Sequence, residues 1–330
     1  MSRARFLLLC PGQGDQHPGM FDLARSSNSN HVGSGGGSSG SGSSSGSDTS
    51  ATATASALID CLPGGGKLAA DVDIYANSVA QPLIVAAALS MWEAIRDFAP
   101  PPALVAGYSI GELAAYGVAG AITPQQAVTL AAQRAQLMDD CQREAPGQAL
   151  LTITGLTLAS AATLAAQHGY HISIETGEDS CIVGGAAARA DQLQQAIESA
   201  GARSKRLPVE VASHTPYMQS AVAPFADALN ATAFQPMLAP VLAGVDAAAV
   251  YEKTRATDTL SRQLAEKIRW LACMDAIAEA GITVALELGP GSALSRMLQN
   301  RHPHIATRSV ADFRTLDGIR RWLERAAEEN

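Results

Sequence analysis

The feature that most constrains this chain is a Gly-x-Ser-x-Gly pattern, Gly107-Tyr108-Ser109-Ile110-Gly111, between a short apolar run and a helix-forming stretch. A strand that turns sharply into a helix at such a pattern lifts a serine clear of its sheet, and the glycines leave room where strand and helix pass each other. The pattern predicts an α/β fold with Ser109 as a nucleophile. The alternative is a glycine-rich connection of the kind found in any α/β protein.

Composition limits the remaining classes of protein. The chain has 330 residues, 47% of them hydrophobic, enough to bury a sizeable core in one large domain or two unequal ones. Its 31 acidic and 23 basic residues give a formal charge of -8, which argues against binding a nucleic-acid backbone. The five cysteines are scattered and lack metal-ligand spacing, so we expect free thiols, a cytoplasmic location and no metal site.

The N-terminal segment predicts a buried strand and then a glycine-rich loop. Its apolar run follows two arginines, as in a signal peptide, but ends at once in Pro11-Gly12-Gln13-Gly14. Glycines on either side of Gln13 let backbone amides point into a cavity, so this loop is either an ordinary turn or, given the serine elbow, a second oxyanion donor. Glu112 interrupts the most apolar candidate for a membrane span, so we expect none.

Residues 26–56 differ from the rest of the chain in composition. Glycine and serine dominate this stretch, which resembles an engineered linker. Such a sequence buries almost nothing, so we expect a flexible coil and assign it no part in the fold.

Arg134 occupies an unusual position on one of two long predicted helices. One helix is expected over residues 81–98, and Thr123-Pro124 is expected to start the other. On the second helix, Arg134 falls in the middle of an apolar stripe. An arginine there is costly unless an anion meets it. It is therefore either half of a core ion pair with an internal acidic residue or a bidentate clamp for a substrate carboxylate.

Residues 147–211 have the pattern of a compact unit inserted into a larger core. The pattern predicts strands at 149–154, 171–175, 180–184 and 205–209, and helices at 158–168 and 190–200. This βαββαβ order is the ferredoxin-like arrangement. We therefore expect a ferredoxin-like subdomain at 147–211 and a core formed by 1–146 and 212–330, with structural or solvated roles for His168 and His171.

His214 is the best candidate for a general base. A β-branched stretch ends there, and Thr215-Pro216 read as cap and first helical residue, so the imidazole is expected at a strand–helix junction. Such junctions are where α/β sheets place their sites. The alternative is a structural histidine.

The C-terminal part predicts further scaffold. We expect a helix over 260–280, a strand over 282–288, a tight turn at 289–291 and helices over 292–298 and 315–328.

Six features, in this order, resemble the malonyl-CoA:acyl-carrier-protein transacylase family, and the match covers nearly the whole chain outside the Gly/Ser-rich stretch. They are Pro11-Gly12-Gln13-Gly14, Gln81-Pro82, the run from Gly107 to Glu112, Arg134, Ser213-His214 and Gly289-Pro290-Gly291. Tyr108, where the family usually has histidine, and Ser213-His214-Thr215-Pro216 are most similar to the epsilon subunit of malonate decarboxylase. Glu266-Lys267 depart from an asparagine-proline pair that is common in the family.

The resemblance implies an α/β-hydrolase-like core with a ferredoxin-like insert, and it implies a malonyl transfer reaction. Ser109 would take the malonyl group from malonyl-CoA, with His214 as its base. The backbone amides of Gln13 and Ile110 would hold the oxyanion. Arg134 would bind the free carboxylate of malonate.

The resemblance also implies how the histidine is oriented and which partner accepts the acyl group. The main-chain carbonyl at Gln263 would orient the imidazole, so no third acidic residue is needed. The acceptor would be an acyl-carrier protein with a phosphopantetheine-type thiol, foremost the malonate decarboxylase carrier subunit, and no cofactor would be tightly bound.

Three other functions use parts of the same pattern. Malonyl transfer for fatty-acid or polyketide synthesis differs only in the carrier that is charged. A serine hydrolase of acyl thioesters would use the same Ser109 and His214, although Arg134 favours an acyl group with a carboxylate. A carrier-binding module without catalysis would need neither residue.

Overall fold

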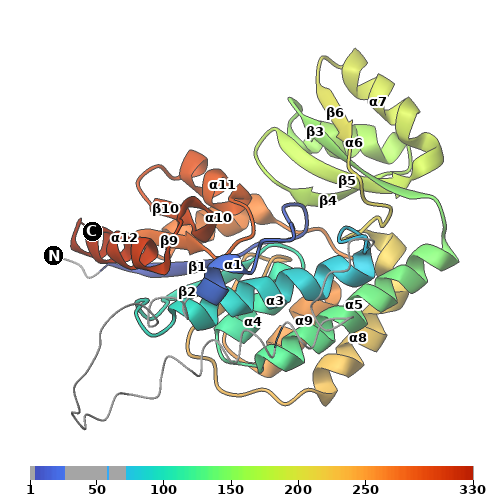
Figure 1. The fold of residues 1–330 in the computed structure, drawn as a ribbon. Coiled ribbons are helices and arrows are strands. Elements are labelled where there is room, and N and C mark those ends of the chain that lie inside the picture. Colours follow the sequence, from blue (N-terminus) through green and yellow to red (C-terminus); the bar gives the residue numbers. More distant parts are fainter. Residues whose placement is uncertain (1–3, 27–57, 59–71, 330) are drawn as a thin grey trace, which may run out of the picture.

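The computed structural model describes residues 4–26, 58 and 72–329. The Gly/Ser-rich stretch at 26–56 lies, apart from Ser26, outside the described residues. Within the described part, a small lobe built from β3, β4, β5, β6, α6 and α7 stands beside a larger body (Figure 1). This mixed α/β arrangement confirms the predicted fold class, whereas the exact domain boundaries at 146/147 and 211/212 remain a prediction.

The larger body is organised around a six-stranded sheet in the order β10-β9-β1-β2-β7-β8. All neighbouring pairs from β10 to β7 are parallel, and β8 is antiparallel to β7. The strands are β1 (Phe6–Cys10), β2 (Leu104–Gly107), β7 (Val241–Leu242), β8 (Ala249–Val250), β9 (Val284–Glu287) and β10 (Ala306–Ser309). Because β1 and β2 are parallel and pair Cys10 with Gly107, the loops that follow them leave the same edge of the sheet.

Helices cover both faces of this sheet. They are α1 (Asp22–Arg25), α3 (Asn77–Ile95), α4 (Gly111–Val118), α5 (Pro124–Glu144), α8 (Gln219–Ala231), α9 (Lys253–Arg262), α10 (Trp270–Glu279), α11 (Ala293–Arg301) and α12 (Leu316–Glu329). Short 3₁₀ helices lie at Ala187–Arg189, Pro216–Met218 and Val310–Asp312.

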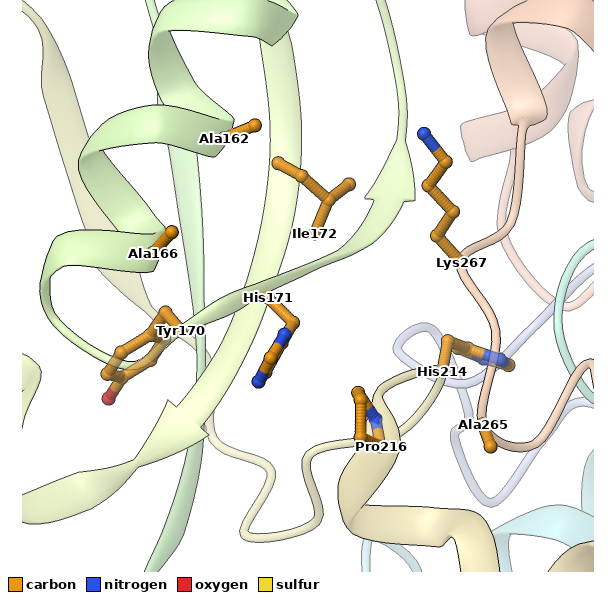
Figure 2. A pocket seen from close by; sticks show the side chains of 9 residues that line it. All are labelled: Ala162, Ala166, Tyr170, His171, Ile172, His214, Pro216, Ala265 and Lys267. Carbon is orange, nitrogen blue, oxygen red and sulfur yellow. The ribbon is translucent and has the colours of Figure 1, made fainter.

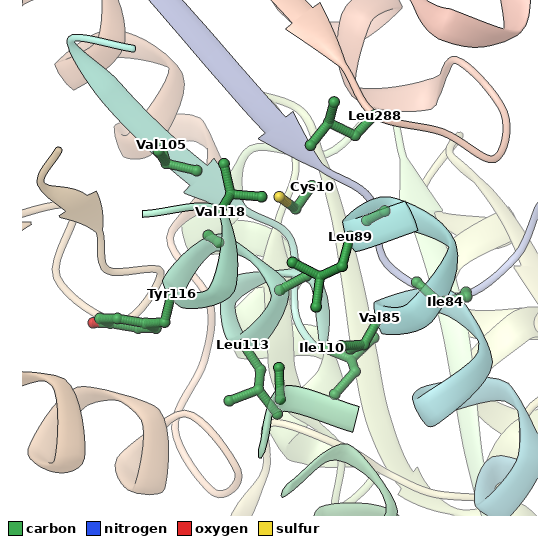
Figure 3. Close-up of a cluster of buried hydrophobic side chains, with 14 of the residues drawn as sticks. Cys10, Ile84, Val85, Leu89, Val105, Ile110, Leu113, Tyr116, Val118 and Leu288 are labelled. Atoms are coloured by element: carbon green, nitrogen blue, oxygen red, sulfur yellow. The ribbon is translucent and has the colours of Figure 1, made fainter. Parts of the chain in front are cut away.

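The alternation of side chains along β1 divides the apolar residues between two cores. Leu8 and Cys10 point into the core shared with α3, α4, α5, α8 and α9, while Leu7 and Leu9 pack against α10 and α11. In the first core, Leu89 of α3 reaches toward α4 (Figure 3). It packs against Gly117, where a side chain would collide with it. These two cores hold the end of β2, and therefore the serine, on a rigid scaffold.

The small lobe has the predicted ferredoxin-like element order. Its strands are β3 (Gln148–Thr154), β4 (His171–Glu175), β5 (Ser180–Ala186) and β6 (Arg203–Arg206), and its helices are α6 (Leu158–Gln167) and α7 (Ala190–Ser199). The sheet is antiparallel in the order β4-β5-β3-β6. A single parallel bridge between Ile174 and Ile268 joins its edge strand β4 to the larger body.

Two predicted elements are wrong. The helix expected over 260–280 is two helices, α9 and α10, with an irregular segment from Gln263 to Arg269 between them. That segment turns aside because its backbone pairs with β4: Ile268 donates to the carbonyl of Ser173, and Glu175 donates to that of Ile268. No strand ends at His214, whose φ of 60° lies in the left-handed region, within a loop.

Helix α3 differs from its prediction in two ways. It begins at Asn77, so Pro82 lies inside the helix instead of in its first turn. By length and composition alone, the helix is also long and apolar enough to span a membrane, although no such segment was expected from the sequence. Inside the protein, 78% of that stretch is buried, as in a core helix.

Candidate active site

The sharp turn after β2 has the geometry of a nucleophile elbow. Ser109 has a φ of 55°, a left-handed conformation that costs a non-glycine residue on the order of 1 kcal/mol or more. A Cβ at Gly107 would lie 2.2 Å from the backbone of Gly111, and one at Gly111 would lie 2.2 Å from the carbonyl oxygen of Cys10. Only glycine fits at both places, so strand β1, strand β2 and helix α4 can meet directly at the serine.

The structure brings Ser109 and His214 together across 105 residues of sequence. The serine Oγ lies 2.7 Å from Nε2 of the imidazole. On the other side of the ring, Nδ1 lies 2.5 Å from the carbonyl oxygen of Gln263. Because a carbonyl can only accept, Nδ1 carries the hydrogen and Nε2 is free to accept the serine hydroxyl proton. The backbone amide of His214 also donates to the carbonyl of Leu264 at 2.8 Å, which holds the loop in place.

The environment of His214 keeps the imidazole neutral. Burial and, to a smaller extent, the nearby positive charge of Arg134 together lower the pKa of His214 from 6.5 to about 3, while the hydrogen bond to Gln263 acts in the opposite direction. A neutral imidazole next to a hydroxyl is the form that a general base needs.

This low pKa predicts the pH dependence of serine acylation. With nitrophenyl acetate, an ester without a carboxylate, the acylation rate is expected to stay flat from about pH 8 to about pH 5, because His214 gains its proton only toward its folded pKa of about 3. Release of nitrophenolate in stopped-flow measurements reports this rate. An acid limb with a midpoint close to 6.5 would contradict the buried, neutral imidazole. His214→Ala serves as the control, and its acylation should be strongly slowed at every pH.

The two backbone amides predicted as oxyanion donors belong to segments that lie beside the elbow. Ile110 directly follows the serine, and the loop with Gln13 follows β1 at the same sheet edge. This loop lies against the elbow, because a Cβ at Gly12 would be 2.9 Å from the carbonyl oxygen of Tyr108. Within the described residues, no acceptor takes the amide hydrogen of Gln13 or of Ile110. Both amides are thus without an acceptor in this part of the chain, and their role as oxyanion donors stays a prediction.

Arg134 is buried on α5 among neutral partners. Its guanidinium is 3% exposed and donates to Oε1 of Gln81 at 2.7 Å and to Oε1 of Gln263 at 3.3 Å. Sδ of Met138 lies 3.2 Å away. In the described part of the chain, no carboxylate oxygen lies within 4.0 Å of this arginine. Burial lowers the pKa of Arg134 to about 10, so the group is still a cation near neutral pH.

Glu112 and the side chain of Gln263 were not predicted from the sequence as parts of this site. Glu112, fully buried on α4, accepts from the side-chain amide of Gln263 at 2.5 Å and from the backbone amide of Gly244 at 2.9 Å. Gln263 was predicted only for its carbonyl, yet its side chain connects Arg134 with Glu112. An acidic residue in an otherwise apolar helix directly after the elbow is the signal that could have identified Glu112.

A groove of about 330 Å³ runs from His214 along the small lobe. Ile172 and His171 of β4, Ala162 of α6, Lys267 and His214 are among the residues that line it. Figure 2 shows Ile172 and His171 on opposite sides of β4 and the imidazole of His214 pointing away from the other labelled side chains. β4 and the segment from Gln263 to Arg269 border this groove together, so both lobes contribute to it.

The described cysteines form no disulfide, and neither they nor the described acidic residues provide a metal site. Cys10, Cys141, Cys181 and Cys273 are buried and free of disulfides. Among the residues that the structure describes, no group of three or more His, Cys, Asp or Glu side chains is arranged to hold a metal ion.

Comparison with known proteins places this geometry in a family context. Residues 70–313 match a family model described as "Acyl transferase domain". Over 270 residues, the chain is 32% identical to the malonyl CoA-acyl carrier protein transacylase of Mycobacterium tuberculosis (strain ATCC 25618 / H37Rv), covering 77% of this chain and 84% of that relative.

Two solved structures share the fold. FabD from Acinetobacter baumannii has a TM-score of 0.84 at 22% identity and covers 98% of this chain and 100% of its own. A malonyl-transacylase in complex with its type II polyketide acyl-carrier protein has a TM-score of 0.79 at 24% identity and covers 99% of this chain and 100% of its own.

Proposed function

Because the chain belongs to the acyl transferase domain family, we propose that it moves a malonyl group from malonyl-CoA to the thiol of an acyl-carrier protein through an ester on Ser109. The observation that carries the malonyl assignment is the buried guanidinium of Arg134, whose hydrogen-bond partners among the described residues are neutral and which lies close enough to depress the pKa of His214. Relatives named malonyl CoA-acyl carrier protein transacylase support the same reaction.

In the first half of the reaction, the serine hydroxyl attacks the thioester carbonyl. His214 Nε2 takes the hydroxyl proton as the Oγ–C bond forms, and the carbonyl of Gln263 stabilises the resulting imidazolium through Nδ1. The amides of Gln13 and Ile110 donate to the oxyanion, and losing one such donor typically costs about 10²–10³ in rate. The C–S bond then breaks, and the imidazolium returns its proton to the departing coenzyme A thiolate.

In the second half, the thiol of the carrier protein, and not water, attacks the malonyl ester on Ser109. Neutral His214 takes the thiol proton as sulfur attacks the malonyl ester, and the proton goes back to Ser109 when the ester bond breaks. The groove beside His214 supports this step, since its volume of about 330 Å³ and its apolar and polar lining residues can accommodate part of a pantetheine arm.

Arg134 selects the acyl group in this proposal. Glu112 interacts with this buried cation only across the Gln263 amide, and a substrate carboxylate would supply the direct hydrogen-bonded contact that Glu112 does not make. Its planar guanidinium can hold a carboxylate through two parallel hydrogen bonds, each worth about 1.5–3 kcal/mol when charge-assisted. A hydrolase of neutral acyl esters would gain nothing from this arrangement.

The identity of the carrier is a finer proposal. Tyr108 and the run from Ser213 to Pro216 favour the carrier subunit of malonate decarboxylase, in the cytoplasm, while malonyl transfer for fatty-acid or polyketide synthesis is the alternative. Tyr108 packs edge-on against Trp270 at 5.2 Å, so the residue that distinguishes the two assignments lies directly beside the nucleophile.

The test is a transfer experiment with purified carriers. The protein is charged with radiolabelled malonyl-CoA, freed of excess substrate and mixed with the malonate decarboxylase carrier, a fatty-acid carrier or buffer alone. Label is expected to move to a carrier within the time in which buffer releases little free malonate, and the faster carrier identifies the pathway. Release of free malonate at the same rate with and without any carrier would establish a hydrolase and overturn the proposal.

A further inference from the structure

A buried hydrogen-bond chain links the acyl pocket to a second ionisable group. Arg134 donates to Oε1 of Gln263, and Nε2 of the same amide donates to Oε2 of Glu112. The amide thus has its oxygen toward the cation and its nitrogen toward the carboxylate. This orientation gives both charged groups a neutral partner and keeps them apart, since the two do not form an ion pair within 4.0 Å in the described structure.

One oxygen of Glu112 is left without any partner. Oε2 accepts two hydrogen bonds, whereas Oε1 is buried and has no hydrogen-bond partner among the described residues. Buried charged oxygens are normally satisfied, because an unsatisfied one loses its hydration without compensation. A bare carboxylate oxygen in such a place is a position at which a proton can be held.

The charge count of the pocket changes when a substrate binds. With the pocket empty, the cation of Arg134 and an ionised Glu112 cancel. A substrate carboxylate on Arg134 adds a second anion to the same buried region and would leave it with a net negative charge, which a medium of low dielectric constant disfavours.

We propose that Glu112 takes up one proton at Oε1 when a substrate carboxylate docks on Arg134, and that this proton uptake determines how strongly the pocket prefers acyl groups that carry a carboxylate. The proton comes from solvent, no covalent bond changes, and the pocket returns to zero net charge. The inference rests on the proposed function, because it needs an acyl carboxylate at Arg134.

The surroundings of Glu112 support this assignment. Burial raises the pKa of Glu112 to about 7, against the lowering effects of the Gly244 amide, Gln263 and Arg134. The other titratable groups that interact with it are Tyr116 on its own helix and Cys273 on α10, and burial raises the pKa of both well above neutrality. His214, which interacts with Arg134, has its pKa lowered. Glu112 is therefore the group in this region that titrates near neutral pH.

The sign of the effect follows from the group that changes. A ligand that binds together with a proton binds more tightly at low pH, so the affinity for malonyl-CoA is expected to fall as the pH rises above about 7. Acetyl-CoA has no carboxylate, and its affinity should not follow this titration.

The experiment measures proton uptake directly. Malonyl-CoA is titrated into the Ser109→Ala variant, which binds without acylation, at about pH 8 in two buffers with different ionisation enthalpies. More than about half a proton is expected to enter per bound molecule, because a group with a pKa of about 7 is then about nine-tenths ionised. With Glu112→Gln added, the uptake should vanish and malonyl-CoA should bind at least about fivefold more tightly at this pH.

Matched variants separate the proposal from a structural role. The side-chain oxygen of glutamine at position 112 can still accept hydrogen bonds from Gly244 and Gln263. If Glu112 had only a structural role, its replacement would lower the binding affinities for malonyl-CoA and acetyl-CoA by the same factor. Glu93→Gln removes another buried carboxylate, on α3 beside Arg96, and should leave the uptake unchanged. If Glu112→Gln does not fold, Glu112→Asp keeps a titrating group and must retain the uptake.

The possible outcomes distinguish the role of Glu112 from the proposed function. Binding of malonyl-CoA without proton uptake, or uptake that persists in Glu112→Gln, overturns the role of Glu112 and leaves the proposed function intact. Failure of a folded Ser109→Ala variant to bind malonyl-CoA in preference to acetyl-CoA instead overturns the proposed function.

Discussion

Brief incubation with malonyl-CoA is expected to leave one malonyl group on the protein, and Ser109→Ala is expected to abolish this adduct in intact mass spectrometry. The reason is that the Oγ atom 2.7 Å from His214 Nε2 is the nucleophile of the proposed reaction. Without it, transfer to a carrier should fall by about 10⁴-fold or more, since residual binding and oxyanion stabilisation cannot replace a covalent intermediate.

Ser90→Ala is the matched control for this change. Ser90 is a buried serine on α3 whose hydroxyl has no hydrogen-bond partner in the described structure, so its removal should leave the adduct unchanged. His214→Ala should slow the adduct's appearance without preventing it. A malonyl adduct of normal yield on a folded Ser109→Ala protein would disprove the nucleophile assignment.

The second large effect is expected at the acyl pocket. Arg134→Ala should lower kcat/KM for malonyl-CoA by about 10²–10⁴-fold, which corresponds to losing two charge-assisted hydrogen bonds to a carboxylate. For acetyl-CoA, kcat/KM should stay the same or rise, because the acetyl group has no carboxylate that Arg134 could bind. Steady-state kinetics with both substrates measure this change in preference.

Arg143→Ala provides the control on the same helix. Arg143 lies near the C-terminal end of α5, is well exposed and pairs with Asp140. Its loss should change kcat/KM by no more than about twofold for either substrate. Thermal unfolding of Arg134→Ala checks that the helix is intact. If kcat/KM falls by the same factor for malonyl-CoA and acetyl-CoA in a folded variant, Arg134 supports the structure without selecting the substrate.

Local sequence pattern was sufficient wherever the physical cause is local. At the elbow the contact between Gly107 and the backbone of Gly111 is local, although Gly111 also meets Cys10 of β1, and the start of α5 follows from a capping box between Thr123 and Gln126. The βαββαβ order also follows from short-range periodicity and turns, and the structure confirms it. Its strand ends shift by a few residues, as for β6, because pairing with a neighbour determines where a strand stops.

Local pattern failed where another part of the chain competes for the same backbone. Residues 260–280 have a helical period throughout, yet the stretch from Gln263 to Arg269 breaks away to pair with β4 of the small lobe. This departure brings the Gln263 carbonyl to the imidazole. Likewise, the β-branched residues before His214 do not form a strand, because the loop is held by Leu264.

Residue types and their spacing were therefore enough to predict a serine and a histidine that the structure brings into contact and an arginine that it buries, since each prediction depends on an intrinsic preference of a short segment. They could not choose between an ion pair and a carboxylate clamp for Arg134. That choice depends on partners 53 and 129 residues away, Gln81 and Gln263, and on Glu112, which is 151 residues from Gln263. Folding of the whole chain brings these groups into one water-excluded space, where the cation has neutral partners and the carboxylate is kept apart by an amide. Charge balance in such a space is a property of the assembled core, and no single segment contains it.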